Sequence, residues 1–351
     1  LEIKNNNFNI NFLYYDKNED SNLVLFFDGV KEIKNKISMN LISLKEKNSE
    51  IKIKNVNFDE NLRIVNFQNA EFKYLDTEDI KNEFKIFSKD KEYILEGKSF
   101  NANNLIEKLL NSEDKSKFNI FKNVFYLNIK IKKVYLDRDN DIKNLNGFLI
   151  FQNEQISEAN LSSKFSVNER LKLTINTTNN EKITTFYSDR AKPFIKRYKF
   201  IKGFEEGSLD FYSSTKNNVS NSALKIYDFK LKELPTLTKL LTLASLQGIA
   251  DILSGEGIRF QEFEMNFNKQ GSLINIDEIY GIGPAISILM EGYVEKNKLI
   301  SLRGTLVPAT TVNKAIASIP ILGEILVGSK TGEGVFGVSF KIKGPPKKLE
   351  T

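Results

Sequence analysis

Two Gly-Glu-Gly sequences hold the acidic residues that are best placed to do chemistry. The stretches 255–257 and 332–334 each follow an apolar run and open an alternating segment, and their glutamates, Glu256 and Glu333, are 77 positions apart. Two carboxylates at one bond can act as general acid and base, as in glycoside hydrolases. Each glutamate, however, occupies the equivalent place in a separate unit, so nothing in the sequence brings the pair together. We therefore assign no catalytic residue.

A structural role explains both Gly-Glu-Gly sequences better. The first glycine, Gly255 or Gly332, suits the left-handed conformation that ends a helix. The second, Gly257 or Gly334, lets the chain reverse into a strand without steric cost. The glutamate between them can accept backbone amide hydrogen bonds. A phosphate-binding loop would need a longer glycine-rich span and a lysine. We therefore expect two tight turns.

The chain has no His, Cys or Trp among its 351 residues. Without His and Cys, the common zinc, copper and iron ligand sets are absent. Ser-His-Asp and Cys-His nucleophile systems are excluded as well. We expect no metal, no cofactor and no enzymatic activity. An enzyme that relies on Asp and Glu alone stays as a weak alternative.

The positive charge is carried almost entirely by lysine. The formal net charge is +6 with a pI near 9.0, yet only seven residues are Arg. Nucleic-acid binders depend on the forked contacts of Arg to phosphate and guanine. Here the lysines alternate singly with Ile, Phe and Leu, which is typical of a solvated strand face. We expect no nucleic-acid partner, and weak attraction to an anionic surface is the less favoured alternative.

Alternation of apolar and polar residues with period two predicts the fold class. It is clear in "IKIK" (51–54), "YLNIKIKKVYL" (126–136) and "LKLTI" (171–175). In the second of these, Ile131 and Val134 have opposite parity, which predicts a bulge or bend. Turn-forming clusters separate the runs. Many strands, each with one solvent-exposed face, predict an all-β, mainly antiparallel sheet.

Helices are expected only near 101–110, 188–199, 236–253 and 311–327. Pro193 is tolerated only near the start of the second helix. Two of these helices lie in the apolar runs 234–255 and 310–328, and the second run is too short and too interrupted to span a bilayer. Packing against the end of a sheet core explains them best. Contact with a membrane or a partner is the alternative.

The segment 234–346 resembles a known family. "LPTLTKLLTLASLQGIADILSGEGIRFQEFEMNF" and the stretch from "GPAISILMEGYVEK" to "VFGVSFKIKGP" are similar to the C-terminal part of the AsmA-like proteins, YhdP branch. The likeness extends in weaker form to 183. In residues 187–211, Arg190 and Lys192 replace small residues of the family and Glu206 replaces a Gly. Within the stronger match, Ala309-Thr310 stands where an Ala-Tyr pair is usual. Residues 1–180 match the family only in their pattern of alternating strands.

The resemblance implies an elongated, curved β-sheet groove with an apolar concave face. It implies domains at 1–110, the end of an upstream groove region, and 111–351, the family's C-terminal domain. Neither end of the chain looks like a natural terminus, so we expect a piece of a longer protein that an N-terminal helix anchors in the bacterial inner membrane. That protein would extend through the periplasm of a Gram-negative envelope.

The resemblance also implies a function without an enzyme or a cofactor. Family members are implicated in moving phospholipid between the inner and outer membranes, which supports outer-membrane homeostasis. The expected partners are phospholipid or another acyl lipid and the two membranes, with an outer-membrane protein as a further candidate. The related TamB branch suggests the alternative, a scaffold or assembly factor for outer-membrane proteins.

Apolar residues of one strand parity are the candidates for lining the groove, although the sequence does not show which parity faces it. Helix residues are weaker candidates, because core packing explains them equally well. The candidates are Leu127, Ile129, Leu171, Leu173, Leu240, Ile249, Phe260, Ile286, Ile288, Ile319, Leu322, Leu326 and Phe336.

Overall fold

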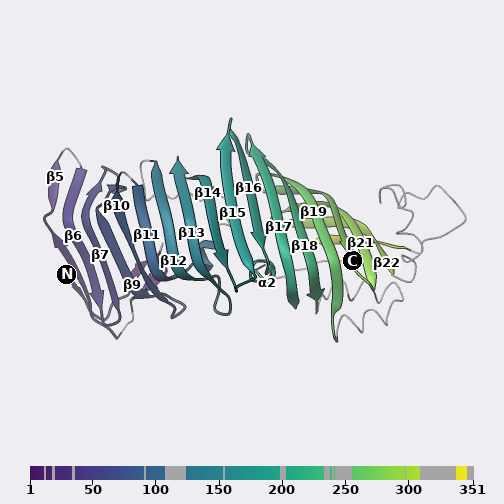
Figure 1. Ribbon diagram of the computed structural model, residues 1–351, viewed down its shortest axis with the longest axis horizontal. Coiled ribbons are helices and arrows are strands. Elements are labelled where there is room, and N and C mark those ends of the chain that lie inside the picture. Colours follow the sequence, from purple (N-terminus) through teal and green to yellow (C-terminus); the bar gives the residue numbers. More distant parts are fainter. Residues whose placement is uncertain are drawn as a thin grey trace, which may run out of the picture. The chain divides into compact units, whose positions relative to one another are not determined.

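The chain forms two compact units, Leu1–Thr177 (unit 1) and Thr178–Thr351 (unit 2). The computed structural model describes residues 1–11, 13–17, 20–33, 36–90, 92–106, 124–152, 155–197, 203–232, 238, 241, 255–296, 298–308 and 337–345. In both units the described residues are mostly strands in a curved, open sheet (Figure 1). The expectation of an all-β, mainly antiparallel fold is confirmed.

Unit 1 is built around ten strands in the pairing order β4-β6-β7-β9-β10-β11-β12-β13-β14-β15. β1 lies beside β4, β5 beside β6 and β8 beside β7, while β2 and β3 form a separate hairpin. The strands are β1 (Glu2–Ile3), β2 (Asn9–Ile10), β3 (Tyr15–Asp16), β4 (Leu23–Asp28), β5 (Lys31–Ile33), β6 (Lys36–Glu46), β7 (Ser49–Phe58), β8 (Ile64–Asn66), β9 (Asn69–Leu75), β10 (Lys81–Lys89), β11 (Glu92–Asn101), β12 (Phe125–Tyr135), β13 (Asp141–Gln152), β14 (Gln155–Lys164) and β15 (Arg170–Thr178).

One strand pair of unit 1 is parallel. β11 and β12 run in the same direction, with Tyr93 opposite Leu127 and Leu95 opposite Ile129. A parallel pair needs a crossover connection rather than a hairpin. Residues 103–106 of that connection are helical, at the start of the helix expected at 101–110. The boundary implied by the resemblance, at 110/111, falls inside this connection and stays a prediction, whereas the compact units divide at 177/178.

Unit 2 is an antiparallel meander in which each strand pairs with the next. Its elements are β16 (Glu181–Ser188), α2 (Lys192–Ile195), β17 (Phe204–Lys216), β18 (Val219–Leu231), β19 (Ile258–Gln270), β20 (Leu273–Ile282), β21 (Ile286–Glu295), β22 (Leu299–Pro308) and β23 (Val338–Gly344).

The connections of unit 2 differ between the two ends of its strands. At one end, the hairpin end, β17–β18, β19–β20 and β21–β22 are joined by two or three residues each. At the other end, the insertion end, longer segments join β16 to β17, β18 to β19 and β22 to β23. The three helices expected in unit 2, at 188–199, 236–253 and 311–327, therefore all fall in connections at the insertion end.

The described helical residues agree with the expected positions. α2 lies within 188–199 and has Pro193 in its first turn, where a missing backbone N–H costs nothing. Thr238 and Leu241 are helical, within the expected helix 236–253. The rest of that helix, the whole of 311–327 and the second turn (Gly332, Glu333 and Gly334) lie outside the described residues.

The predicted change of parity in β12 is also present. Ile131, Val134 and Leu136 are all buried, although Ile131 and Val134 are three residues apart. β12 and β13 stay in register across this point, with Ile131 opposite Leu145 and Val134 opposite Ile142. Both strands therefore change phase together. In β13 the change is made at Asn144, which adopts a φ of 54°.

Gly257 has the conformation that its place in the turn predicts. Its φ is +90°, and a Cβ atom there would lie 2.7 Å from the carbonyl oxygen of Leu231 and 2.6 Å from Cγ of Lys232. Gly255 and the exposed Glu256 form the turn before it. Both the backbone conformation and the space therefore require glycine at 257.

We predict that Gly257→Ala destabilises the protein by about 2 kcal/mol, because the new Cβ combines a disfavoured φ with a backbone clash. Gly271→Ala is the matched control. Gly271 has a φ of +60°, but nothing lies within 4 Å of its Cβ position. Its substitution should cost about 1 kcal/mol or less. Urea unfolding measures both, and equal losses would contradict the role of the close contact.

Candidate functional site

One face of the unit 1 sheet is apolar across ten strands. Directly opposed residues on neighbouring strands share a face, so the pairing register defines rows of side chains that cross the sheet. The central row contains Phe27, Ile42, Ile53, Ala70, Ile86, Leu95, Ile129, Gly147, Leu161 and Leu173. Every member is apolar. We call this side the apolar face of unit 1.

A second row of the same face runs parallel to the first. It contains Leu25, Leu44, Ile51, Phe72, Phe84, Gly97, Ile131 and Leu145. Leu127 lies on this face too, opposite Tyr93 and Leu149, and Leu171 lies opposite Ser163. The four unit 1 candidates from the sequence therefore share one face.

Aromatic pairs lie on the apolar face beside the central row. Tyr93 stacks on Phe125 with ring centroids 4.4 Å apart, and Phe125 meets Phe151 edge to face at 6.1 Å. Phe72 and Phe84 stack at 4.6 Å. Such pairs contribute about 0.5–1.5 kcal/mol each beyond the area they bury. They fix the positions of the strands that carry the face.

The opposite face of the same strands is charged and polar. Its central row contains Phe26, Ser43, Lys52, Glu71, Lys85, Glu96, Lys130, Asn146, Ser162 and Lys172. Lysine and glutamate alternate across its middle, and Lys85 pairs with Glu96 at 3.4 Å. The lysines of these strands are on the solvated face, as the sequence predicts.

Side chains of the apolar face are well shielded for an open sheet. Leu44, Ile51, Phe84 and Ile131 are buried. Apart from the β2–β3 hairpin, the described strands of unit 1 form no second sheet that could cover them. The apolar face is therefore shielded although no second layer of described strands covers it.

The strands of unit 2 also place one parity on an apolar face, and its insertion end is a packed core. Eleven buried residues form this cluster: Ala191, Ile195, Phe204, Leu209, Ile226, Phe229, Leu241, Ile258, Phe260, Ile286 and Leu306. Phe229 stacks between Phe204 and Phe260, with both centroid distances 5.3 Å. α2 supplies Ile195, and the helical residue Leu241 is fully buried.

The unit 2 candidates from the sequence fall in and beside this core. Phe260 and Ile286 are buried within it, so packing accounts for them. Ile288 is partly buried at its border, opposite Gly281 and Leu306. The remaining candidates, Leu240, Ile249, Ile319, Leu322, Leu326 and Phe336, lie outside the described residues.

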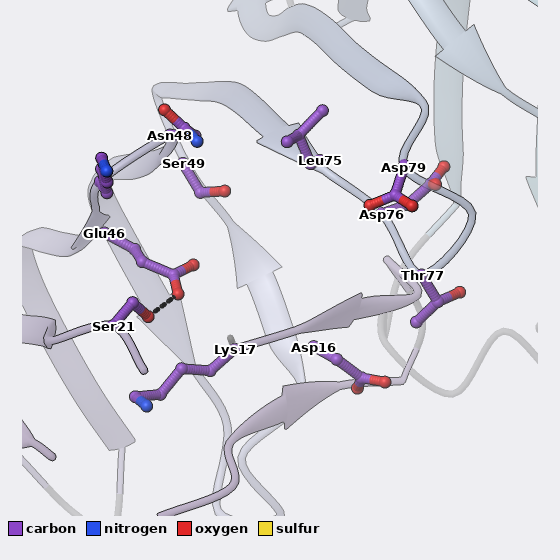
Figure 2. A pocket seen from close by; sticks show the side chains of 11 residues that line it. Asp16, Lys17, Ser21, Glu46, Asn48, Ser49, Leu75, Asp76, Thr77 and Asp79 are labelled. Carbon is purple, nitrogen blue, oxygen red and sulfur yellow. Dashed lines mark hydrogen bonds between the residues drawn. The ribbon is translucent and has the colours of Figure 1, made fainter. Parts of the chain in front are cut away.

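A polar pocket in unit 1 is the rival site, and Figure 2 shows its lining side chains. It lies between β3, the β6–β7 turn and the β9–β10 turn, and it contains several acidic groups. Glu46 accepts hydrogen bonds from the hydroxyls of Tyr15 and Ser21. The bond from Ser21 is drawn in Figure 2. The carboxylate thus ties the N-terminal hairpin to the sheet.

Asp76, in the same pocket, holds a turn together. Its Oδ1 accepts the backbone N–H groups of Glu78 and Ile80, and its Oδ2 accepts the side-chain amides of Asn82 and Asn101 at 3.0 and 2.8 Å. Buried Asp59 and Asp137 cap other turns of the unit in the same way. Strand alternation does not predict this Asp-turn pattern, although "DENLR", "DTEDI" and "DRDN" carry it. The pocket is therefore a structural feature.

Comparisons with protein-family models, with curated proteins and with solved structures found no match to this chain. Within the described residues, no cluster of His, Cys, Asp or Glu is arranged to hold a metal ion. A search of the same residues found no helix with the length and hydropathy needed to cross a bilayer.

We predict that Asp76→Asn destabilises the protein by about 2–3 kcal/mol, because an amide cannot accept all four hydrogen bonds that the carboxylate accepts. Asp79→Asn, in the same turn, is the control, because Asp79 is exposed and Asn tolerates its φ of 61°. Thermal unfolding compares them. A melting temperature lowered equally by both changes would show that Asp76 has no special role in the turn.

Proposed function

We propose that the chain binds the acyl chains of lipid on its apolar faces, as a segment of a bridge-like lipid-transfer protein. The observation that supports this most directly is the central row of unit 1, which is apolar across ten strands while the opposite row is charged. A soluble protein rarely keeps a large apolar surface without a partner.

The size of the face suits an acyl chain. Each methylene shielded from water contributes about 0.8 kcal/mol, so a chain of some sixteen carbons needs roughly 12 kcal/mol of shielding. The central row spans nine strand-to-strand steps of about 4.8 Å each, or roughly 43 Å, which exceeds the length of one acyl chain. No position in it differs sharply from the next, so bound lipid could slide along it.

The resemblance to the AsmA-like proteins, YhdP branch, gives this proposal its cellular setting. In that setting the chain is a periplasmic piece of a protein anchored in the inner membrane, and it carries phospholipid between the inner and outer membranes. The energy source and direction of transport would come from elsewhere in the envelope.

Exposed apolar side chains on β4 favour a second candidate function, a scaffold for outer-membrane proteins. Val24 and Phe26 are 41% and 52% exposed on the otherwise polar side of unit 1. Exposed apolar side chains that lie together can mark a site of protein–protein contact. Lipid that copurifies with the protein favours transfer, and stable binding of an outer-membrane barrel without lipid favours the scaffold.

The first test is photocrosslinking in cells. A photoreactive residue at Leu173, on the apolar face, should crosslink to lipid, whereas one at Lys172, on the opposite face, should not. Mass spectrometry of the crosslinked products identifies the lipid. Crosslinks at neither position, or equal crosslinks at both, would contradict the proposal.

We further predict that Leu173→Asp lowers the lipid recovered with the purified protein by about tenfold or more, because an unpaired charge beside an acyl chain costs several kcal/mol. Thr174→Asp is the control, since it adds the same charge to the other face of β15. Both variants should keep the wild-type circular dichroism spectrum. If Leu173→Asp retains full lipid content and activity, the scaffold becomes the better proposal.

A further inference from the structure

On the side of unit 2 that carries its core, which we call the inner side, the residues change from apolar to polar toward the hairpin end. Four rows cross β16–β23 on this side, and the two nearest the insertion end are apolar except at Ser188. The row nearest the hairpin end begins with Lys182, Thr215, Ser220 and Lys269 before it becomes apolar at Ile274. The next row begins with Thr184, Ser213 and Ser222 and becomes apolar at Phe267.

At the hairpin end of β16, the charged and apolar residues have exchanged faces. Ile183 is 38% exposed on the outer face, opposite Ser214, while Lys182 lies on the same side as Phe186. Phe186 packs against the core cluster and meets Phe194 of α2. In an ordinary strand with one solvated face, the isoleucine would face the core and the lysine would face the solvent. A lysine on the core side instead calls for an anionic partner.

The described strands offer these lysines no carboxylate. None of the four rows across β16–β23 contains an Asp or Glu. Burial lowers the pKa of Lys182. By contrast, Lys225 on the outer face pairs with Glu264. Within the described strands of unit 2, the two half-buried lysines on the inner side therefore share no row with an acidic residue.

The residues between the two lysines can donate hydrogen bonds. Thr215 and Ser220 are opposite one another and link the two lysines across β16–β19. In the adjoining row, the buried hydroxyl of Ser222 donates to that of Ser213 at 2.9 Å. Ammonium and hydroxyl donors on one surface, without acceptor charges, match a phosphate or carboxylate.

We propose that Lys182 and Lys269, with the hydroxyls of Thr215 and Ser220, bind the anionic head group of an acyl lipid whose chain lies on the adjoining apolar rows. The apolar neighbours in this arrangement are Phe267, Met265 and Leu224, which follow the polar residues toward the insertion end. This inference rests on the proposed function and specifies the substrate class: lipids that carry a net negative head group.

The test measures which lipid the delipidated full chain extracts from vesicles of dioleoyl phosphatidylglycerol and dioleoyl phosphatidylcholine in equal amounts. The two lipids have the same acyl chains and differ in head-group charge. We expect the wild-type protein to recover the anionic lipid in about tenfold excess, the gain expected from about one charge-assisted contact. In Lys182→Gln/Lys269→Gln the recovered ratio should fall to about one, with total lipid largely retained.

Two variants serve as controls. Lys216→Gln/Lys230→Gln removes the same charge from the outer face of β17 and β18 and should keep the wild-type ratio. Lys182→Arg/Lys269→Arg keeps the charge and should keep the preference. A preference that survives in Lys182→Gln/Lys269→Gln, or is lost equally in Lys216→Gln/Lys230→Gln, overturns the head-group site.

The remaining outcomes separate this inference from the proposed function. Equal recovery of both lipids by the wild-type protein overturns the head-group site and leaves acyl-chain binding intact. Recovery of neither lipid overturns both. Isothermal titration with inorganic phosphate tests a free anion as the ligand. Phosphate binding that requires both lysines, together with no lipid preference, would assign the site to a free anion instead.

Discussion

Strand register is the constraint on which the rest of this structure depends. Side chains alternate between the faces of a strand, so a slip of one residue moves a whole strand to the wrong face. The central row of unit 1 is apolar only because nine successive pairings keep the same parity. Where β12 changes phase after Ile131, β13 changes with it, so the face continues across the bend.

The strand ends determine how much of each face is available. In unit 2, the insertion end is filled by the stack of Phe204, Phe229 and Phe260 beneath α2 and Leu241. In unit 1, Tyr15 of the N-terminal hairpin packs edge to face on Tyr74, and Thr77 donates its backbone N–H to Tyr14. Packing at these strand ends stabilises each unit. The remaining length of each apolar face is then available for binding.

Local patterns in the sequence predicted local structure well. The alternation in "IKIK" and "LKLTI" gave strands, the parity change after Ile131 gave a bend, and the place of Gly257 gave its positive φ. The parallel β11–β12 pair could not be predicted, because it depends on a long crossover. Lysine alternation predicts the solvated face at Lys85 and Lys130 but misleads at Lys182, since only the register shows that Ile183 takes the outer position.

The inverted position of Lys182 bears on how a groove could hold lipid as well as let it slide. A uniformly apolar row, such as the one through Ile129, gives an acyl chain no preferred position. A row that contains Lys182 and Lys269 and becomes apolar at Ile274 would favour a charged head group at the lysines and an acyl tail beyond them. Head groups would then stay at the hairpin end of unit 2, because the apolar rows and packed core lie toward the insertion end. Orientation of the lipid would thus come from the sheet itself, through the same register that keeps the tails out of water.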